Sequence, residues 1–101
     1  MKIGIDIMGG DYAPLETTLG VIRALPDLTD DVKLVLFGDR HAITDLFSKE
    51  GADISKVEIV HTTEVIGMDE HPTKAITQKQ DSSIARGFEY LKKGEIDAFA
   101  G

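Results

Sequence analysis

A chain of 101 residues with 42% hydrophobic and 29% charged residues has the composition of one small globular domain. Its net charge of −7 argues against general nucleic-acid binding, because that binding depends on neutralising phosphates with Lys and Arg. The sequence has no cysteine, which excludes disulfides and thiolate metal sites, and no apolar run reaches the length of a transmembrane helix. An acid already at Asp6 argues against a signal peptide, so we expect a cytoplasmic protein.

The first elements that the sequence predicts are a strand over residues 2–8 and a helix after it. The strand is rich in isoleucine, and the helix lies between Pro14, which suits a first turn, and Pro26, which ends it. Apolar residues recur at helical spacing between the two prolines: Leu15, Leu19, Ile22 and Leu25.

The turn Gly9-Gly10-Asp11 connects this strand to this helix. Paired glycines at such a turn let backbone N–H groups approach an anion, and the helix N-terminus adds partial positive charge. The turn lacks both the three-glycine dinucleotide fingerprint and the Gly-Lys-Ser/Thr ending of a P-loop. Its spacing therefore fits a plain tight turn as well as a phosphate cradle, and Asp11 is either a helix cap or part of a site.

Asp6 lies late in a strand that should be buried on both faces. A buried carboxylate is costly unless it has hydrogen-bond partners. Two interpretations of Asp6 stay open: a structural carboxylate that neighbouring loop N–H groups satisfy, and a carboxylate that faces a ligand pocket.

The middle of the chain continues the alternation of strands and helices. Residues 32–38 and 57–62 predict two strands, and residues 41–50 predict an amphipathic helix with Gly51 at the position of a left-handed cap. The apolar residues of this helix are Ile43, Leu46 and Phe47.

A long irregular segment, residues 63–73, follows the third predicted strand. It should lie at the same sheet edge as the glycine turn, and long loops of this kind are often functional. His71 in this segment is a candidate site residue, although a lone loop histidine is more often simply solvated.

The last predicted elements are a helix over residues 82–93 and a strand over residues 96–100. The N-cap oxygens at its start come from Asp81, Ser82 and Ser83. Its apolar face carries Ile84, Phe88 and Leu91, and Gly94 ends it. The cluster before the helix also has a functional interpretation, as a helix N-terminus that offers hydroxyl and N–H groups to an anion.

Strands separated by helices of this length pair in parallel through right-handed crossovers, with helices on both faces of the sheet. The sequence therefore predicts a doubly wound α/β fold, in which ligands gather outside the carboxyl ends of the strands.

Residues 74–93 carry five basic and two acidic side chains, a local net charge of +3. This segment is either a solvated helix face or a surface for an anion or an acidic partner.

Five segments in order along the whole chain resemble the bacterial PlsX family, enzymes that transfer an acyl group from acyl carrier protein to phosphate. The segments are Asp6-Ile7-Met8-Gly9-Gly10-Asp11-Tyr12-Ala13-Pro14, Val57-Glu58-Ile59-Val60-His61, Lys74-Ala75-Ile76, Lys79-Gln80-Asp81-Ser82-Ser83-Ile84 and Asp97-Ala98-Phe99. Two residues depart from the family pattern, since Ile7 replaces a small Ala and Thr77 stands where many members carry Arg. The second departure makes Lys74 or Lys79 more important as a phosphate-binding cation.

The resemblance implies a three-layer α/β/α fold with a Rossmann-like, doubly wound, mostly parallel sheet like that of isocitrate and isopropylmalate dehydrogenases. Residues 1–101 would be the N-terminal part of a single larger domain, and we expect this part to be inactive alone. The whole enzyme would convert acyl-acyl carrier protein and inorganic phosphate into acyl phosphate for phospholipid synthesis, without a cofactor. The family also implies a cytoplasmic homodimer, with peripheral membrane association through the rest of the chain.

The same resemblance assigns the candidate site residues, and no metal ligand is among them. The catalytic candidates are Asp6, Asp11 and Lys74, and the candidates for binding phosphate or substrate are Gly9, Gly10, Lys79, Asp81, Ser82 and Ser83. The alternative function is a non-catalytic phosphate- or nucleotide-binding module. A phosphoacceptor receiver module is disfavoured, because it needs an Asp where the third strand ends in His61-Thr62.

Overall fold

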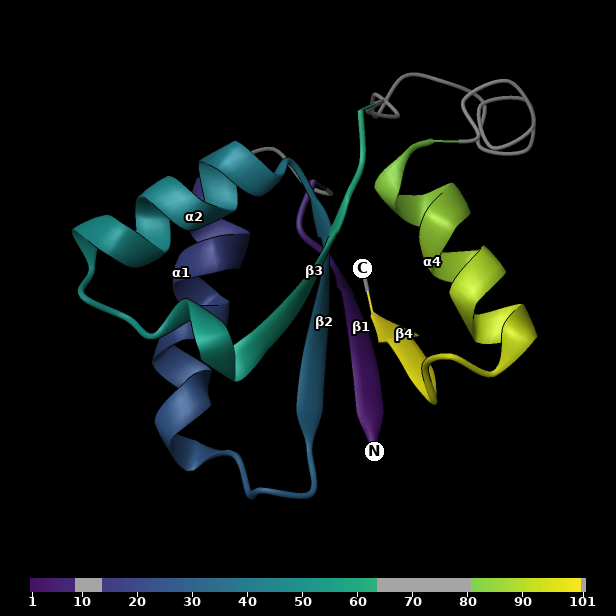
Figure 1. Ribbon diagram of the computed structural model, residues 1–101, viewed down its shortest axis with the longest axis horizontal. Coiled ribbons are helices and arrows are strands. Elements are labelled where there is room, and N and C mark those ends of the chain that lie inside the picture. The colour runs from purple at the N-terminus through teal and green to yellow at the C-terminus, as the bar shows by residue number, and fades with distance from the viewer. Residues whose placement is uncertain (9–13, 64–80, 101) are drawn as a thin grey trace.

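The computed structural model describes residues 1–8, 14–63 and 81–100. Four parallel strands form one sheet in the order β3-β2-β1-β4 (Figure 1). Their bounds are Lys2–Asp6 for β1, Lys33–Gly38 for β2, Val57–His61 for β3 and Ala98–Ala100 for β4. All four predicted strands are therefore confirmed, with ends that shift by one or two residues.

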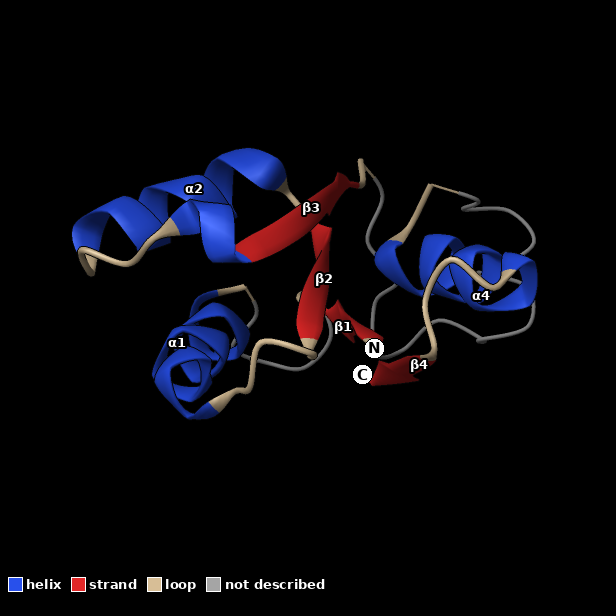
Figure 2. Ribbon diagram, turned by 60° about the horizontal axis from the view of Figure 1, so that its bottom comes forward, coloured by secondary structure: helices blue, strands red, loops and turns tan. Residues whose placement is uncertain are grey.

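Helices cover both faces of the sheet and produce three layers, as Figures 1 and 2 show. Helices α1, Leu15–Ala24, and α2, Arg40–Lys49, lie on one face, and α4, Ser83–Lys93, lies on the other. Each face has its own core: Ile7, Val21, Leu34, Leu36, Ile43, Phe47 and Val57 on the first, and Val35, Phe37 and Ile96 on the second. The predicted α/β fold with helices on both faces is confirmed.

The helix ends follow from local hydrogen bonding and backbone geometry. Pro14 is the N-cap of α1 and so precedes its first turn. Asp39 caps α2, because its Oδ1 accepts hydrogen bonds from the backbone N–H groups of His41 at 2.9 Å and Ala42 at 3.4 Å. Gly51 has the left-handed conformation predicted for it, with φ of 65°. None of the helices in the described ranges is long and apolar enough to cross a lipid bilayer.

Helix α4 packs on the sheet through a side that its apolar spacing did not indicate. Ser83 and Gly87 are buried, whereas Phe88 and Leu91 are 51% and 38% exposed. Gly87 lies against the ring of Phe99 in β4 so closely that a Cβ atom at this position would lie 2.2 Å from the ring. This contact between helix backbone and strand side chain turns the predicted apolar face of α4 partly toward solvent.

The strand order gives the carboxyl end of β1 a special position. From β1 the chain forms β2 and then β3 on one side, and it later pairs β4 with β1 on the other side, with Ala98 opposite Ile3. Such a reversal is the switch point at which ligands bind in open α/β sheets. Asp6 is the last residue of β1, so the fold places it at this point.

Candidate functional site at the carboxyl edge of the sheet

Asp6 joins the end of β1 to the beginning of α4. Its side chain is on the α4 side of the sheet, and the residue is only 4% exposed. Its Oδ1 atom accepts hydrogen bonds from the backbone N–H of Met8, at 3.0 Å, and from the hydroxyl of Ser83. The expectation that a buried Asp6 has hydrogen-bond partners is confirmed, and one of them comes from 77 residues further along the chain.

The two serines at the start of α4 have separate structural tasks. Ser82 is the N-cap, and its Oγ accepts a hydrogen bond from the backbone N–H of Ala85 at 3.2 Å. The Ser83 hydroxyl donates a hydrogen bond to Oδ1 of Asp6. The hydrogen bond from Ala85 confirms the capping interpretation for Ser82. Both serines are buried. Binding of a ligand by either residue stays a prediction.

Asp81 connects the beginning of α4 to the end of β3. Its Oδ2 atom accepts hydrogen bonds from the backbone N–H and the hydroxyl of Thr63, at 3.1 and 2.5 Å. Its Oδ1 atom lies 3.9 Å from Nε of Arg86, an ion pair at the surface of the helix. The carboxylate therefore holds α4 beside β3, while Asp6 and Ser83 hold it beside β1.

These contacts make the stability of the chain depend on the ionisation of Asp81. The Thr63 hydroxyl, then the Thr63 amide and the nearby Arg86 and His61 charges, hold the pKa of Asp81 below its ordinary value of 3.8. A carboxylate with a lowered pKa in the folded state stabilises that state above its ordinary pKa, and the contribution is lost as the pH falls through the folded-state pKa.

We therefore expect Asp81→Asn to lower the melting temperature at pH 7 and to have a smaller effect as the pH falls below 3.8. Thermal unfolding of the wild type and the variant at pH 7 and at stepwise lower pH measures this difference. Asp45→Asn, at an exposed position of α2, controls for the change of net charge. An equal decrease for Asp81→Asn at all pH values would contradict the expectation.

Thr62 and Arg86 are two further residues at this edge, and the sequence motifs do not include either of them. The hydroxyl of Thr62 and Nε of Arg86 are buried, and neither has a hydrogen-bond partner in the structure. A threonine at a strand end gives no specific sequence signal. Arg86 did carry a signal, because it is one of the basic residues of the segment 74–93.

The structure brings together four of the predicted site residues: Asp6, Asp81, Ser82 and Ser83. The remaining ones lie outside the described residues: Gly9, Gly10, Asp11, Lys74 and Lys79, as does His71. Within the described ranges, no three side chains of the metal-ligating types come together.

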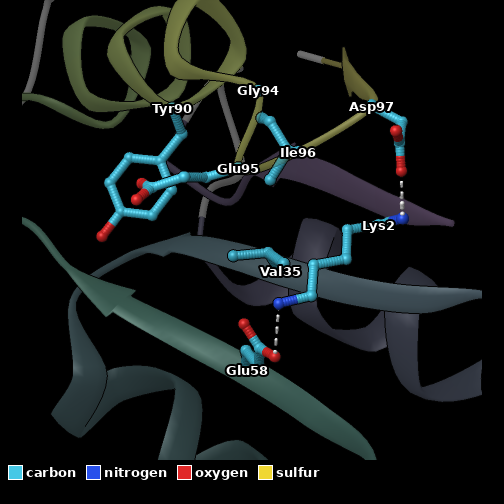
Figure 3. A pocket seen from close by; sticks show the side chains of 8 residues that line it. All are labelled: Lys2, Val35, Glu58, Tyr90, Gly94, Glu95, Ile96 and Asp97. Carbon is cyan, nitrogen blue, oxygen red and sulfur yellow. Dashed lines mark hydrogen bonds and ion pairs between the residues drawn. The ribbon is translucent and has the colours of Figure 1, made fainter.

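A hollow of about 520 Å³ lies at the opposite, amino-terminal edge of the sheet (Figure 3). Among the described residues that line it, Lys2 is the only cationic one, and its Nζ already lies 3.2 Å from Glu58 while its backbone N–H donates to Asp97 at 2.7 Å. Glu95 adds a third carboxylate to the lining. Three carboxylates and one ammonium group disfavour an anionic ligand, so this hollow does not compete with the carboxyl edge for phosphate.

Comparison with known proteins agrees with the motifs. A model of the fatty acid synthesis protein family matches residues 1–101. Proteins named phosphate acyltransferase from Caldicellulosiruptor saccharolyticus, Thermoanaerobacterium thermosaccharolyticum and Caldicellulosiruptor bescii are 50%, 48% and 46% identical over 99 residues. These alignments cover 98% of this chain and 28 to 29% of each relative, so the chain spans little more than a quarter of the length of these relatives. The chain belongs to the fatty acid synthesis protein family, which is the PlsX family that its motifs resemble.

Proposed function

We propose that this chain is the N-terminal part of a single larger α/β domain of a phosphate acyltransferase. The full-length protein would convert acyl-acyl carrier protein and inorganic phosphate into acyl phosphate for phospholipid synthesis. The observation that carries this proposal is the 46 to 50% identity to three relatives named phosphate acyltransferase over nearly the whole chain.

In this reaction, a phosphate oxygen attacks the thioester carbonyl, a tetrahedral oxyanion forms, and the C–S bond breaks to release the thiolate. The reaction needs an anion site, donors for the oxyanion and a proton for the thiolate. Phosphate is partly dianionic at neutral pH, so a strong general base is not required.

The carboxyl edge of the sheet supports this chemistry at the start of α4. Ser82 begins the helix there, and Asp6 fixes its position through Ser83. The first turn of the helix carries partial positive charge, which favours a bound phosphate. In this proposal Gly9, Gly10, Lys79 and the residues 81–83 bind phosphate, Lys74 balances charge, and Asp6 and Asp11 orient the backbone or the substrate.

Three further properties belong to the same proposal. The full-length enzyme would be a cytoplasmic homodimer, would take acyl carrier protein as its partner, and would associate with the membrane only through parts beyond residue 101. No nucleic acid is expected to bind, because the net charge of this chain is −7.

The decisive test is an assay of the purified full-length protein with an acyl-acyl carrier protein and inorganic phosphate, in which hydroxylamine traps the acyl phosphate as a hydroxamate. We expect phosphate-dependent hydroxamate formation by the full-length protein and none by residues 1–101 alone, because most of the enzyme's length is missing from them. Full-length protein that forms no acyl phosphate would contradict the proposed function. Hydroxamate formed by residues 1–101 would contradict only the prediction that they are inactive. Calorimetric titration with nucleotides tests the alternative binding module.

A further inference from the structure

Thr62 places a buried hydroxyl at the start of α4. Thr62 directly follows β3, and its backbone N–H donates to the Gly38 carbonyl oxygen of β2 at 3.0 Å, which continues the pairing of the two strands. Val60 packs against the core under α4, so by alternation Thr62 lies on the same face of the sheet. Its neighbour Thr63 donates its backbone N–H to the Asp81 carbonyl oxygen at 3.2 Å, which brings this part of the chain beside the α4 N-terminus.

The Thr62 hydroxyl lacks the partner that its burial calls for. Thr62 is only 4% exposed, and its Oγ1 has no hydrogen bond in the structure. Buried polar groups nearly always have a partner, and an exception in a native structure calls for an explanation such as a bound ligand. The hydroxyl of the neighbouring Thr63, by contrast, donates a hydrogen bond to Asp81.

Arg86 adds a second buried donor atom, its Nε, near the start of α4. It lies one helical turn after the N-cap, and its backbone N–H donates to the Ser82 carbonyl oxygen at 3.0 Å. Nε of Arg86 is buried without a hydrogen bond, although it lies 3.9 Å from the Asp81 carboxylate. Asp81 contacts Arg86 through one oxygen and Thr63 through the other, so it brings Arg86 close to the end of β3.

These groups share one chemical property. The Thr62 hydroxyl and the Arg86 guanidinium donate hydrogen bonds, and the first turn of α4 adds partial positive charge. The Asp81 carboxylate opposes an anion at this edge, but two Thr63 donors already bind its Oδ2. Asp39 at the end of β2 caps α2. An oxyanion fits this arrangement, because it accepts several hydrogen bonds at once.

We propose that Thr62 and Arg86 bind inorganic phosphate, with the Thr62 hydroxyl and the Arg86 guanidinium donating hydrogen bonds to its oxygens. The proposal rests on the proposed function, because that function makes phosphate the acceptor substrate. It adds two phosphate-binding residues to the candidates that the sequence motifs supplied. One of the two is an arginine near the start of α4.

The test compares variants of the full-length protein in which the side chains keep nearly the same shape. Thr62→Val removes the hydroxyl, and we expect it to raise the KM for phosphate about tenfold without changing the KM for the acyl thioester, since a hydrogen bond to a charged group is lost. Thr62→Ser keeps a hydroxyl and is expected to bind phosphate more tightly than Thr62→Val. Arg86→Met is expected to raise the KM for phosphate at least as much as Thr62→Val. Thr44→Val, at an exposed position of α2, is the matched control and should leave both constants unchanged.

Calorimetry with inorganic phosphate measures the same site without turnover. We expect Thr62→Val and Arg86→Met to weaken phosphate binding about tenfold, even if the full-length protein shows no acyl transfer and the proposed function fails. Unchanged phosphate affinity in folded Thr62→Val and Arg86→Met proteins would overturn the inference. A rise only in the KM for the acyl carrier would also overturn it, because the group bound there would then belong to the carrier. Melting curves identify any variant that fails to fold, and Thr62→Ala, which also lacks the hydroxyl, takes the place of Thr62→Val if that variant does not fold.

Discussion

Replacing Gly87 with alanine is expected to destabilise the chain, although alanine is the better helix former. The new Cβ atom would lie 2.2 and 2.3 Å from two ring carbons of Phe99, so the helix or the ring must move. Overpacking of a core costs about 1 to 3 kcal/mol, and so close a contact should reach the upper end of that range. The gain in helix propensity offsets about 1 kcal/mol, which leaves a net loss of about 2 kcal/mol.

Gly20→Ala provides a matched control for this substitution. Gly20 lies inside α1, as Gly87 lies inside α4, but a Cβ atom at Gly20 would have no neighbour within 4 Å. The same change should therefore stabilise the chain there by up to about 1 kcal/mol. Urea denaturation of both variants measures the two effects. If both substitutions stabilise the chain, the result would contradict the close packing of Gly87 against the Phe99 ring.

Replacing Asp6 with alanine is expected to cost about 3 kcal/mol of folding stability, because hydrogen bonds to a buried charged group are lost and their donors stay buried. The change would leave the Met8 N–H and the Ser83 hydroxyl without their acceptor. Asp6→Asn keeps one acceptor oxygen and should cost less. In the full-length protein Asp6→Ala should also lower the rate of acyl phosphate formation, because it removes the hydrogen bond that holds the start of α4 at the end of β1, and Asp6→Asn should lower it less.

A double-mutant cycle with Ser83→Ala separates this hydrogen bond from the other effects of losing Asp6. The effects of Asp6→Ala and Ser83→Ala should be less than additive by about 1 to 2 kcal/mol, because either change alone removes the contact between the two side chains. Urea denaturation of the two single variants and the double variant measures this coupling. Strictly additive losses would show that the contact contributes nothing to stability.

Local sequence patterns predicted most of the fold because its elements follow local rules. Gly51 and Gly94 both have the positive φ expected of residues that end helices, and Ser82 caps α4 as its residue type suggests. The side of α4 that faces the sheet could not be predicted in this way. It depends on the fit between Gly87 and Phe99, which belong to different elements, and helical periodicity identifies only the apolar stripe.

The candidate site was predictable one residue at a time but not as an arrangement. Asp6 was expected late in a buried strand and Ser83 at the start of a helix, yet their hydrogen bond joins residues that are 77 positions apart. No sequence pattern indicated Thr62, because only the packed structure shows that its hydroxyl is buried without an acceptor. Long-range packing therefore decides which polar groups at this edge remain available to a ligand.

The strand order also determines when this edge can form during folding. Strands β1, β2 and β3 are consecutive in the chain, whereas β4 pairs with β1 across 95 positions, Ile3 with Ala98. Contacts between distant residues form slowly, because a long loop must close first. The first three strands can pair before α4 and β4 pack on them, and until then Asp6 lacks its hydrogen bond from Ser83. We therefore expect the carboxyl edge, where Asp6 meets Ser83, to be completed late in the folding of this chain.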